Sequence, residues 1–386
     1  MTARRVLPPR GGPHKLTAAS FAYASEILPW VTTNVSVSPF GSDWWSFNPS
    51  IHHDPRTGRW LCVFRCADYS LPGGVPKLSN ASRPGRAETR NVVAAVNPST
   101  WELGALVEIE ERDGCPRAAG CASIGYEDMR LFRTERYGLC AIATALQLNI
   151  EHPNRPEMIF CQFNDDFAIS SATPLRGAWS ARPQKNWSPF DGADEPRFLY
   201  SIERGVVMGE DGPVDGSPPP TQPPAPRTFD MHKRGVEVKV TPRNVYSEQP
   251  KYAKAKIGSD DLRGGSQLAR IGGDLWLGLA HEMTLTQPER RKLYWHTFYA
   301  CDSAGRLLSR SEPFKLSPDH GIEFAAGLAL GDRGLVAISY GTDDSESWIA
   351  RTELSAVLGL LRKVAESTAD VTPIDPKKTI GMRFGS

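Results

Sequence analysis

Five short clusters in the chain could carry chemistry, because each combines charged or amide side chains with an aromatic ring or a glycine. Their first residues lie 79, 59, 78 and 78 positions apart. Such spacing is typical of a radial β-repeat, in which every unit sends one loop to a common axis. Carboxylates, amides, guanidiniums and indoles around one axis would suit a sugar-binding pocket. The clusters are residues 47–50 (FNPS), 126–130 (YEDMR), 185–190 (KNWSPF), 263–267 (RGGSQ) and 341–344 (GTDD).

Glu127 and Asp128 are adjacent carboxylates that precede a strand-like segment. Neighbouring carboxylates repel each other, which raises the pKa of one of them unless a cation relieves it. Arg130 could be this cation for one carboxylate, which leaves the other as a proton donor. The alternative is a solvated turn, and the even spacing of the clusters favours the functional interpretation.

Two other clusters offer groups that bind anions. Lys185, Asn186 and Trp187 supply a positive charge, an amide and a stacking surface. Arg263 precedes two glycines, which let a backbone approach a ligand closely. His281 follows 18 positions later, and a single hairpin would return it beside Arg263. Together these groups could bind phosphate, and surface ion pairing is the alternative.

The elements that must position these clusters are short strands rich in Val, Ile, Phe, Tyr and Trp. Helical periodicity is confined to residues 354–364. We therefore expect an all-β chain, a five-bladed β-propeller with a short C-terminal helix. The expected strands are 59–65, 90–96, 104–110, 129–134, 138–146, 156–163, 196–202, 235–241, 266–271, 274–281, 293–300, 334–340 and 347–352.

The domain organisation follows from where these strands begin and end. An N-terminal tail is expected over residues 1–25, the propeller over 26–365 and a C-terminal tail over 366–386. The proline-rich segment 209–228 cannot form ladder hydrogen bonds and is expected to be an exposed loop. A linker between two domains is the alternative, but the repeat runs across this segment.

Composition excludes several classes of partner. The 45 basic and 44 acidic residues give a net charge of +1, so neither nucleic acid nor an anionic membrane is an expected partner. The first 25 residues lack the apolar region of a secretory signal, and no apolar stretch is long enough for a spanning helix. Seven cysteines without a Cys-x-x-Cys pair are interpreted as buried thiols in a reducing cytoplasm, with a Cys115–Cys121 bridge as the alternative. Homo-oligomerisation is left open.

Metal and cofactor motifs are weak in this sequence. His52, His53 and Asp54 are consecutive, but successive strand residues face opposite ways, so no metal site is expected. The sequence also lacks a P-loop, a dinucleotide-binding glycine motif and zinc-finger spacing. No cofactor is therefore expected.

With these motifs in this order, the chain resembles the five-bladed propeller enzymes of the β-mannoside phosphorylase family (glycoside hydrolase family 130) and the related mannosyltransferases. The resemblance spans about residues 40–355. It departs from the family pattern at Met129, at Asn186 and at residues 325–327. The matching motifs are Asn48-Pro49, Arg65, Gly125-Tyr126-Glu127-Asp128-Met129-Arg130, Lys185, Arg263 with His281, and Tyr340-Gly341-Thr342-Asp343-Asp344.

The resemblance implies an inverting glycoside phosphorylase or glycosyltransferase for a mannosyl-type sugar, with Asp128 as general acid. Phosphate is itself a nucleophile, so one acid suffices, whereas an inverting hydrolase needs a second carboxylate at about 6.5–9.5 Å. The co-substrate would be inorganic phosphate, a sugar phosphate or a sugar nucleotide. A glycoside hydrolase of the same fold and a non-catalytic carbohydrate-binding propeller are the alternatives. The predicted substrate-binding residues are Asn48, Arg65, Glu127, Arg130, Trp187 and Asp343, and the predicted phosphate-binding residues are Lys185, Arg263 and His281.

Overall fold

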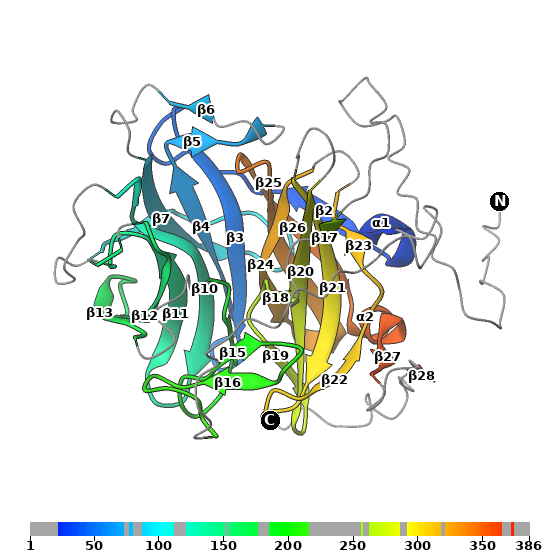
Figure 1. Ribbon diagram of the computed structural model, residues 1–386. Coiled ribbons are helices and arrows are strands. Elements are labelled where there is room, and N and C mark those ends of the chain that lie inside the picture. The colour runs from blue at the N-terminus through cyan, green and yellow to red at the C-terminus, as the bar shows by residue number, and fades with distance from the viewer. Residues whose placement is uncertain are drawn as a thin grey trace, which may run out of the picture.

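Antiparallel sheets follow one another around a common axis in the computed structural model, which is a β-propeller arrangement (Figure 1). The all-β prediction is confirmed, since strands dominate and helices are few and short. No helix in the described part of the chain has the length and apolar character needed to cross a membrane. The structure describes residues 22–72, 77–79, 87–111, 121–149, 151–152, 154–176, 185–215, 256–257, 262–285, 292–317, 321–364 and 372–373.

Four of the sheets contain a run of four antiparallel strands. The first has β3 (Trp45–Asp54), β4 (Arg59–Ala67), β7 (Ala87–Val96) and β8 (Val107–Ile109). The second has β10 (Tyr126–Thr134), β11 (Gly138–Ala145), β12 (Glu157–Phe163) and β13 (Ile169–Pro174). A later one has β19 (Ala269–Gly272), β20 (Leu275–Leu285), β21 (Lys292–Cys301) and β22 (Leu307–Arg310), and β18 (Arg263–Gly264) also pairs with β20.

The last of the four sheets joins the two ends of the described chain. It has β24 (Glu323–Leu330), β25 (Leu335–Thr342) and β26 (Glu346–Glu353), and its fourth strand is the N-terminal β2 (Val31–Asn34). Between the second sheet and the β19–β22 sheet, the chain forms a three-stranded sheet of β14 (Ser188–Pro189), β15 (Phe198–Ser201) and β16 (Val206–Met208).

The remaining helices and strands are shorter. The helix α2 (Leu354–Leu360) confirms the predicted C-terminal helix, and it ends four residues earlier than the apolar pattern does. Residues 22–25, which the sequence places in the N-terminal tail, form β1 and the first half of α1. The remaining elements are β1 (Ala22–Tyr23), α1 (Ala24–Ile27), β5 (Tyr69–Ser70), β6 (Lys77–Leu78), β9 (Ser123–Ile124), β17 (Lys256–Ile257), β23 (Phe314–Lys315), β27 (Arg362–Lys363), β28 (Thr372–Pro373) and a 3₁₀ turn at Asp332–Gly334.

Apolar clusters fill the spaces between neighbouring sheets. Leu61 of the first sheet packs in one cluster with Leu131 of the second. Ile51 of the first sheet shares another cluster with Ala329 and Ile349 of the last sheet. The first and last sheets are therefore neighbours, and the ring closes on itself.

The first strands of the sheets lie together at the centre, where β3, β10 and β24 contact one another. Polar residues are buried here: the Ser50 hydroxyl accepts a hydrogen bond from the Leu131 N–H (3.0 Å), and the Ser339 hydroxyl accepts one from the Ile51 N–H (2.9 Å). These strands do not alternate between apolar and polar residues. The strands predicted from the sequence accordingly include neither β24 nor any part of β3.

The structure agrees with the predicted repeat for four clusters, whereas the fifth cluster lies at a different position in its sheet. The first four lie at or beside the start of the first strand of a sheet. Residues 341–344 instead span the turn between β25 and β26, one strand further along. The equivalent position in the last sheet is the register shift between Ala325 and Gly327. The proline-rich loop falls mostly outside the described residues, as do the expected strand 235–241 and Cys115.

Candidate active site

Three residues near the starts of the innermost strands adopt a left-handed backbone. The φ values are 47° for Asn48, 51° for Asp128 and 63° for Asn186. In β3 and β10 the pairing register shifts at these positions, which is the signature of a β-bulge. A bulge re-aims a side chain, and Asn and Asp tolerate this conformation better than most residues. The fold thus brings these three polar residues to one end of the axis.

Asp128 is the centre of a buried hydrogen-bonded group at this end. Its Oδ1 accepts from the Asn48 amide at 2.8 Å and from the Arg65 guanidinium at 2.9 Å. The other Nη atom of Arg65 lies 3.1 Å from Oε1 of Glu127 and donates to the Tyr69 hydroxyl at 2.6 Å. Asn48 and Asp128, from two separate clusters, and Arg65, from the family resemblance, therefore meet through direct contacts.

The electrostatics of this group favour ionised side chains. Burial alone would raise the pKa of Asp128, but Arg65, Lys185 and the hydrogen bond from Asn48 hold this pKa well below its usual range. Burial likewise lowers the pKa of Arg65, and the negative charge of Glu127 and its neighbours more than offsets this effect. Asp128 is a carboxylate at neutral pH in the absence of a ligand.

Lys185, which lies just before β14, adds a cation to this cluster. Its ammonium nitrogen lies 3.4 Å from Oε2 of Glu127, and its side chain is 35% exposed while that of Glu127 is 8% exposed. The lysine therefore remains accessible to a ligand while it neutralises a buried carboxylate.

Arg263 and His281 are directly paired, as the sequence predicts. They face each other in the register of β18 and β20, with Arg263 exposed and His281 buried. Burial lowers the pKa of His281 well below its usual value, and the charges of His296, Arg263 and Arg130 lower it further. Asp128 acts on His281 in the opposite direction. His281 is therefore a neutral imidazole at neutral pH.

Arg130 has a different partner from the one that the sequence suggests. Its Nη1 donates to the backbone carbonyl of Asp128 at 3.2 Å rather than to a carboxylate, and Arg65 makes the carboxylate contacts instead. Arg130 also donates to Oδ1 of Asn186 at 3.0 Å and to the Gly265 carbonyl. Burial lowers its pKa to about 10. The side chain is fully buried and connects the inner strands through these hydrogen bonds.

Trp187 is wrongly predicted as a stacking surface for a sugar. The indole is 1% exposed and packs edge-on against Tyr200 (5.4 Å between ring centroids) within a core cluster that also contains Phe198. Asn186 lies at the axis, and the next residue turns into the space between sheets. A ligand at the axis does not reach this ring.

Asp344 joins the charged group, although the sequence analysis selected its neighbour Asp343. Burial raises the pKa of Asp344 to about 6, Arg65 lowers it, and Asp128 and Glu127 raise it. The sequence does indicate Asp344, since the Tyr-Gly-x-x-Asp motif places its Asp at this residue. The role of Asp343 in sugar binding stays a prediction.

Two aromatic residues of the site were also missed. Tyr69 bonds Arg65, and Tyr294 of β21 stacks on His281 with 5.8 Å between ring centroids. Neither belongs to a cluster, and only the paired strands bring them there. Glycines near the site, in contrast, are explained by strand packing: a Cβ on Gly264 would lie 2.5 Å from the Asn186 carbonyl oxygen. One on Gly341 would lie 2.4 Å from the Asn48 nitrogen.

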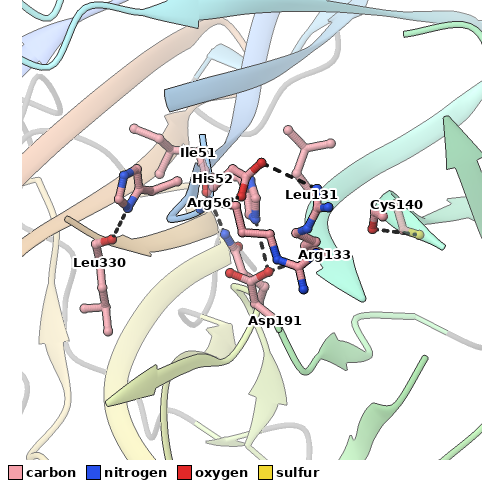
Figure 2. Close-up of polar contacts among 12 residues, drawn as sticks. Ile51, His52, Arg56, Leu131, Arg133, Cys140, Asp191 and Leu330 are labelled. Atoms are coloured by element: carbon pink, nitrogen blue, oxygen red, sulfur yellow. Dashed lines mark hydrogen bonds and ion pairs between the residues drawn. The ribbon is translucent and has the colours of Figure 1, made fainter. Parts of the chain in front are cut away.

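The opposite end of the inner strands is tied together by a separate network (Figure 2). His52 Nε2 lies 3.0 Å from Oδ1 of Asp191, which also accepts from the Arg133 N–H at 2.8 Å. His53 points elsewhere and donates through Nδ1 to the Leu330 carbonyl at 2.7 Å. No cluster of three potential metal-ligating side chains occurs within the described ranges.

A groove of about 1010 Å³ lies between the three-stranded sheet and the β19–β22 sheet. Its lining includes Arg136, Arg197, Arg270, Asp274 and Trp276. None of the predicted site residues lines it.

Comparison with models of known protein families gives no match. Comparison with curated protein sequences gives none either.

Several solved structures have a similar arrangement. A β-1,2-mannobiose phosphorylase from Listeria innocua has 12% identity and a TM-score of 0.45, over 88% of this chain and 98% of the other. A glycosyl hydrolase from Bacteroides ovatus has 15% identity and a TM-score of 0.48, over 86% and 93%. The mannose phosphorylase MPT-4 from Leishmania mexicana has 9% identity and a TM-score of 0.40, over 83% and 88%. Similarity at this level assigns no activity.

Proposed function

We propose that the protein is a carbohydrate-active enzyme, an inverting glycoside phosphorylase or glycosyltransferase for a mannosyl-type sugar. The observation that carries this proposal is the meeting of Asn48, Arg65 and buried Asp128 with the Arg263–His281 pair at one end of the axis. Amide, carboxylate and guanidinium groups suit sugar hydroxyls, and the charge of Arg263 with an N–H donor of the neutral His281 imidazole suits an anion.

The balance of charge favours an anionic co-substrate. Cations outnumber carboxylates among the charged groups that interact with Asp128, His281 and Asp344, so a phosphate or phosphoryl group would be attracted to this site. We propose inorganic phosphate, a sugar phosphate or a sugar nucleotide as the co-substrate, and no resident cofactor. The cations are Arg65, Arg130, Lys185, Arg263 and Lys292, and the carboxylates are Glu127, Asp128 and Asp344.

Asp128 is the proposed general acid, which requires a proton that the ligand-free protein does not supply. Burial raises the pKa of this carboxyl, and Arg65 and Lys185 lower it by more. A phosphate dianion bound at Arg263 and His281 would place negative charge nearby and raise this pKa again. In this proposal Asp128 is protonated only when phosphate is bound, and the proton reaches the leaving group directly or through a sugar hydroxyl.

The two alternatives differ in what they require of the carboxylates. A hydrolase needs a second carboxylate to activate water, and Glu127 and Asp344 are both near Asp128. A binding module has no use for a buried Asp128 opposite an anion site, so the burial of Asp128 favours an enzyme.

Other parts of the proposal concern the whole chain. We infer that the propeller has five blades, with the three-stranded sheet counted as one of them. We also infer that the enzyme is cytoplasmic and acts on a small or oligomeric sugar. A homo-oligomer is left open.

Activity screening tests this function. With a mannose acceptor, we expect a sugar 1-phosphate to release inorganic phosphate or a sugar nucleotide to release its nucleotide, and with a mannoside we expect uptake of inorganic phosphate. Arg263→Ala and His281→Ala should each raise the KM for phosphate by about 10–100-fold, because a hydrogen bond to a charged group contributes about 1.5–3 kcal/mol. Arg270→Ala, an exposed arginine of the same sheet, is the control. Mannoside cleavage that is independent of phosphate in all variants would identify a hydrolase instead.

A further inference from the structure

Strand β21 brings side chains to the candidate site that belong to none of the sequence motifs. Alternate residues of a strand face the same side of a sheet, so Lys292, Tyr294 and His296 share one face. His296 is the direct partner of His281 in the register of β20 and β21, and Tyr294 is the partner of Met283, two residues further on. This face is therefore the one that carries His281.

Tyr294 lies against the proposed anion site. Its ring stacks on the imidazole of His281 at an interplanar angle of 27°, and the ring of Phe324 packs edge-on against the same imidazole at 4.9 Å. Burial raises the pKa of Tyr294 to about 12, the charges of Asp344 and Asp128 raise it, and Arg263 lowers it. The phenol thus stays protonated at neutral pH.

The polar atoms on this face have few protein partners. The Tyr69 hydroxyl accepts a hydrogen bond from Arg65, whereas no hydrogen bond of the Tyr294 hydroxyl is found among the described residues. Nδ1 of His281 is buried and has no partner within the same set of residues. Buried polar groups in folded proteins are nearly always paired, so the unpaired Nδ1 of His281 indicates a polar ligand, and the Tyr294 hydroxyl is available to the same ligand because its ring stacks on this imidazole.

We propose that Tyr294 is a further phosphate-binding residue, whose hydroxyl donates a hydrogen bond to a phosphate or phosphoryl oxygen held by Arg263 and His281. This inference rests on the proposed function and adds a residue to its anion site. A phenol suits this position because it donates without adding charge beside two carboxylates. The stack on His281 fixes the ring, so little rotamer entropy is lost when the ligand binds.

The experiment uses Tyr294→Phe, which keeps the ring and removes only the hydroxyl. Calorimetric titrations with inorganic phosphate and, separately, with mannose are performed on the full-length protein. We expect phosphate to bind about 10–100-fold more weakly to the variant, as for the loss of one hydrogen bond to a charged group, and mannose to bind equally. Tyr137→Phe is the matched control, because Tyr137 is also half-buried but belongs to the turn between β10 and β11. Its phosphate affinity should equal that of the wild type.

The outcomes separate this inference from the proposed function. If the wild type binds phosphate and Tyr294→Phe binds it equally well, the role of Tyr294 is overturned and the function stands. A variant that loses mannose affinity but keeps phosphate affinity assigns Tyr294 to the sugar and also overturns the inference. If the wild type binds no phosphate, both the proposed anion site and the role of Tyr294 in it are overturned. Equal melting temperatures of the variant and the wild type would exclude misfolding as the cause of a change.

Discussion

Asp128 and Arg65 show how the site is held at the level of single residues. Each is buried, and each is stabilised in its charged form by the other and by neighbouring polar groups. Breaking a buried ion pair is costly, because it leaves a charge without a partner. An isosteric amide is therefore the informative change at Asp128, since its oxygen can still accept the hydrogen bonds from Asn48 and Arg65.

We predict that Asp128→Asn lowers turnover by about 10²–10⁴-fold, the usual contribution of general acid–base catalysis. Ligand affinity and melting temperature should change little. Substrates with activated leaving groups need less protonation and should be partly rescued. Asp54→Asn is the control, because Asp54 is also buried and hydrogen-bonded but lies at the other end of β3. A lower melting temperature with unchanged turnover per folded molecule would make Asp128 a structural residue.

Asp344 gives a prediction for the dependence of stability on pH. Its pKa in the folded protein is raised to about 6 from a usual value of 3.8, so the folded protein holds a proton that the unfolded chain has lost between these values. Stability from this group therefore falls as the pH rises from about 4 to about 6. Asp344→Asn should raise the melting temperature at pH 8 and have little effect at pH 4 or below. An equal difference at both pH values would contradict this assignment.

At the scale of elements, the inner strands are polar, bulged and closely packed. Arg130 of β10 connects them by donating to Asn186 and to the Gly265 carbonyl near β18. A buried group that loses its partner costs about 1–3 kcal/mol. Arg130→Ala removes the donor from three acceptors, the Asp128 and Gly265 carbonyls and Oδ1 of Asn186, and should lower the free energy of unfolding by several times this cost, measured by urea denaturation. Arg136→Ala, at an exposed ion pair, should change it little. Equal effects of the two substitutions on the free energy of unfolding would show that Arg130 does not hold the inner strands together.

These same strands explain how far the sequence could predict the molecule. Middle strands of the sheets, such as β4, β11 and β21, follow β-propensity and were predicted, and the pairing of Arg263 with His281 followed from one hairpin. The inner strands bury Ser50 and His52, so their patterns do not resemble those of ordinary strands. Whether a side chain points to the axis or between sheets also depends on bulges. The sequence therefore could not show that Trp187 packs in the core.

At the scale of the whole molecule, the ring is closed by the N-terminal strand β2. It pairs with β26 from Val31↔Arg351 to Asn34↔Trp348, and the Val35 N–H donates to the Ser347 carbonyl at 2.8 Å. In the described chain this pairing joins the two ends of the ring. Without it β26 would become an exposed edge, which invites aggregation.

Removal of the first 34 residues should therefore lower the melting temperature sharply and promote aggregation, as measured by thermal unfolding and light scattering. A synthetic peptide of residues 28–38, added in excess, should restore part of the lost stability, because binding to the folded state alone shifts the unfolding equilibrium. The same peptide with Thr33→Pro is the control. By the alternation of an antiparallel ladder, Thr33 is in a hydrogen-bonded pair with Ile349, and proline removes its N–H. Equal rescue by both peptides would show that the peptide does not act by adding a strand. A truncated chain with unchanged stability would show that the ring does not depend on β2 for its closure.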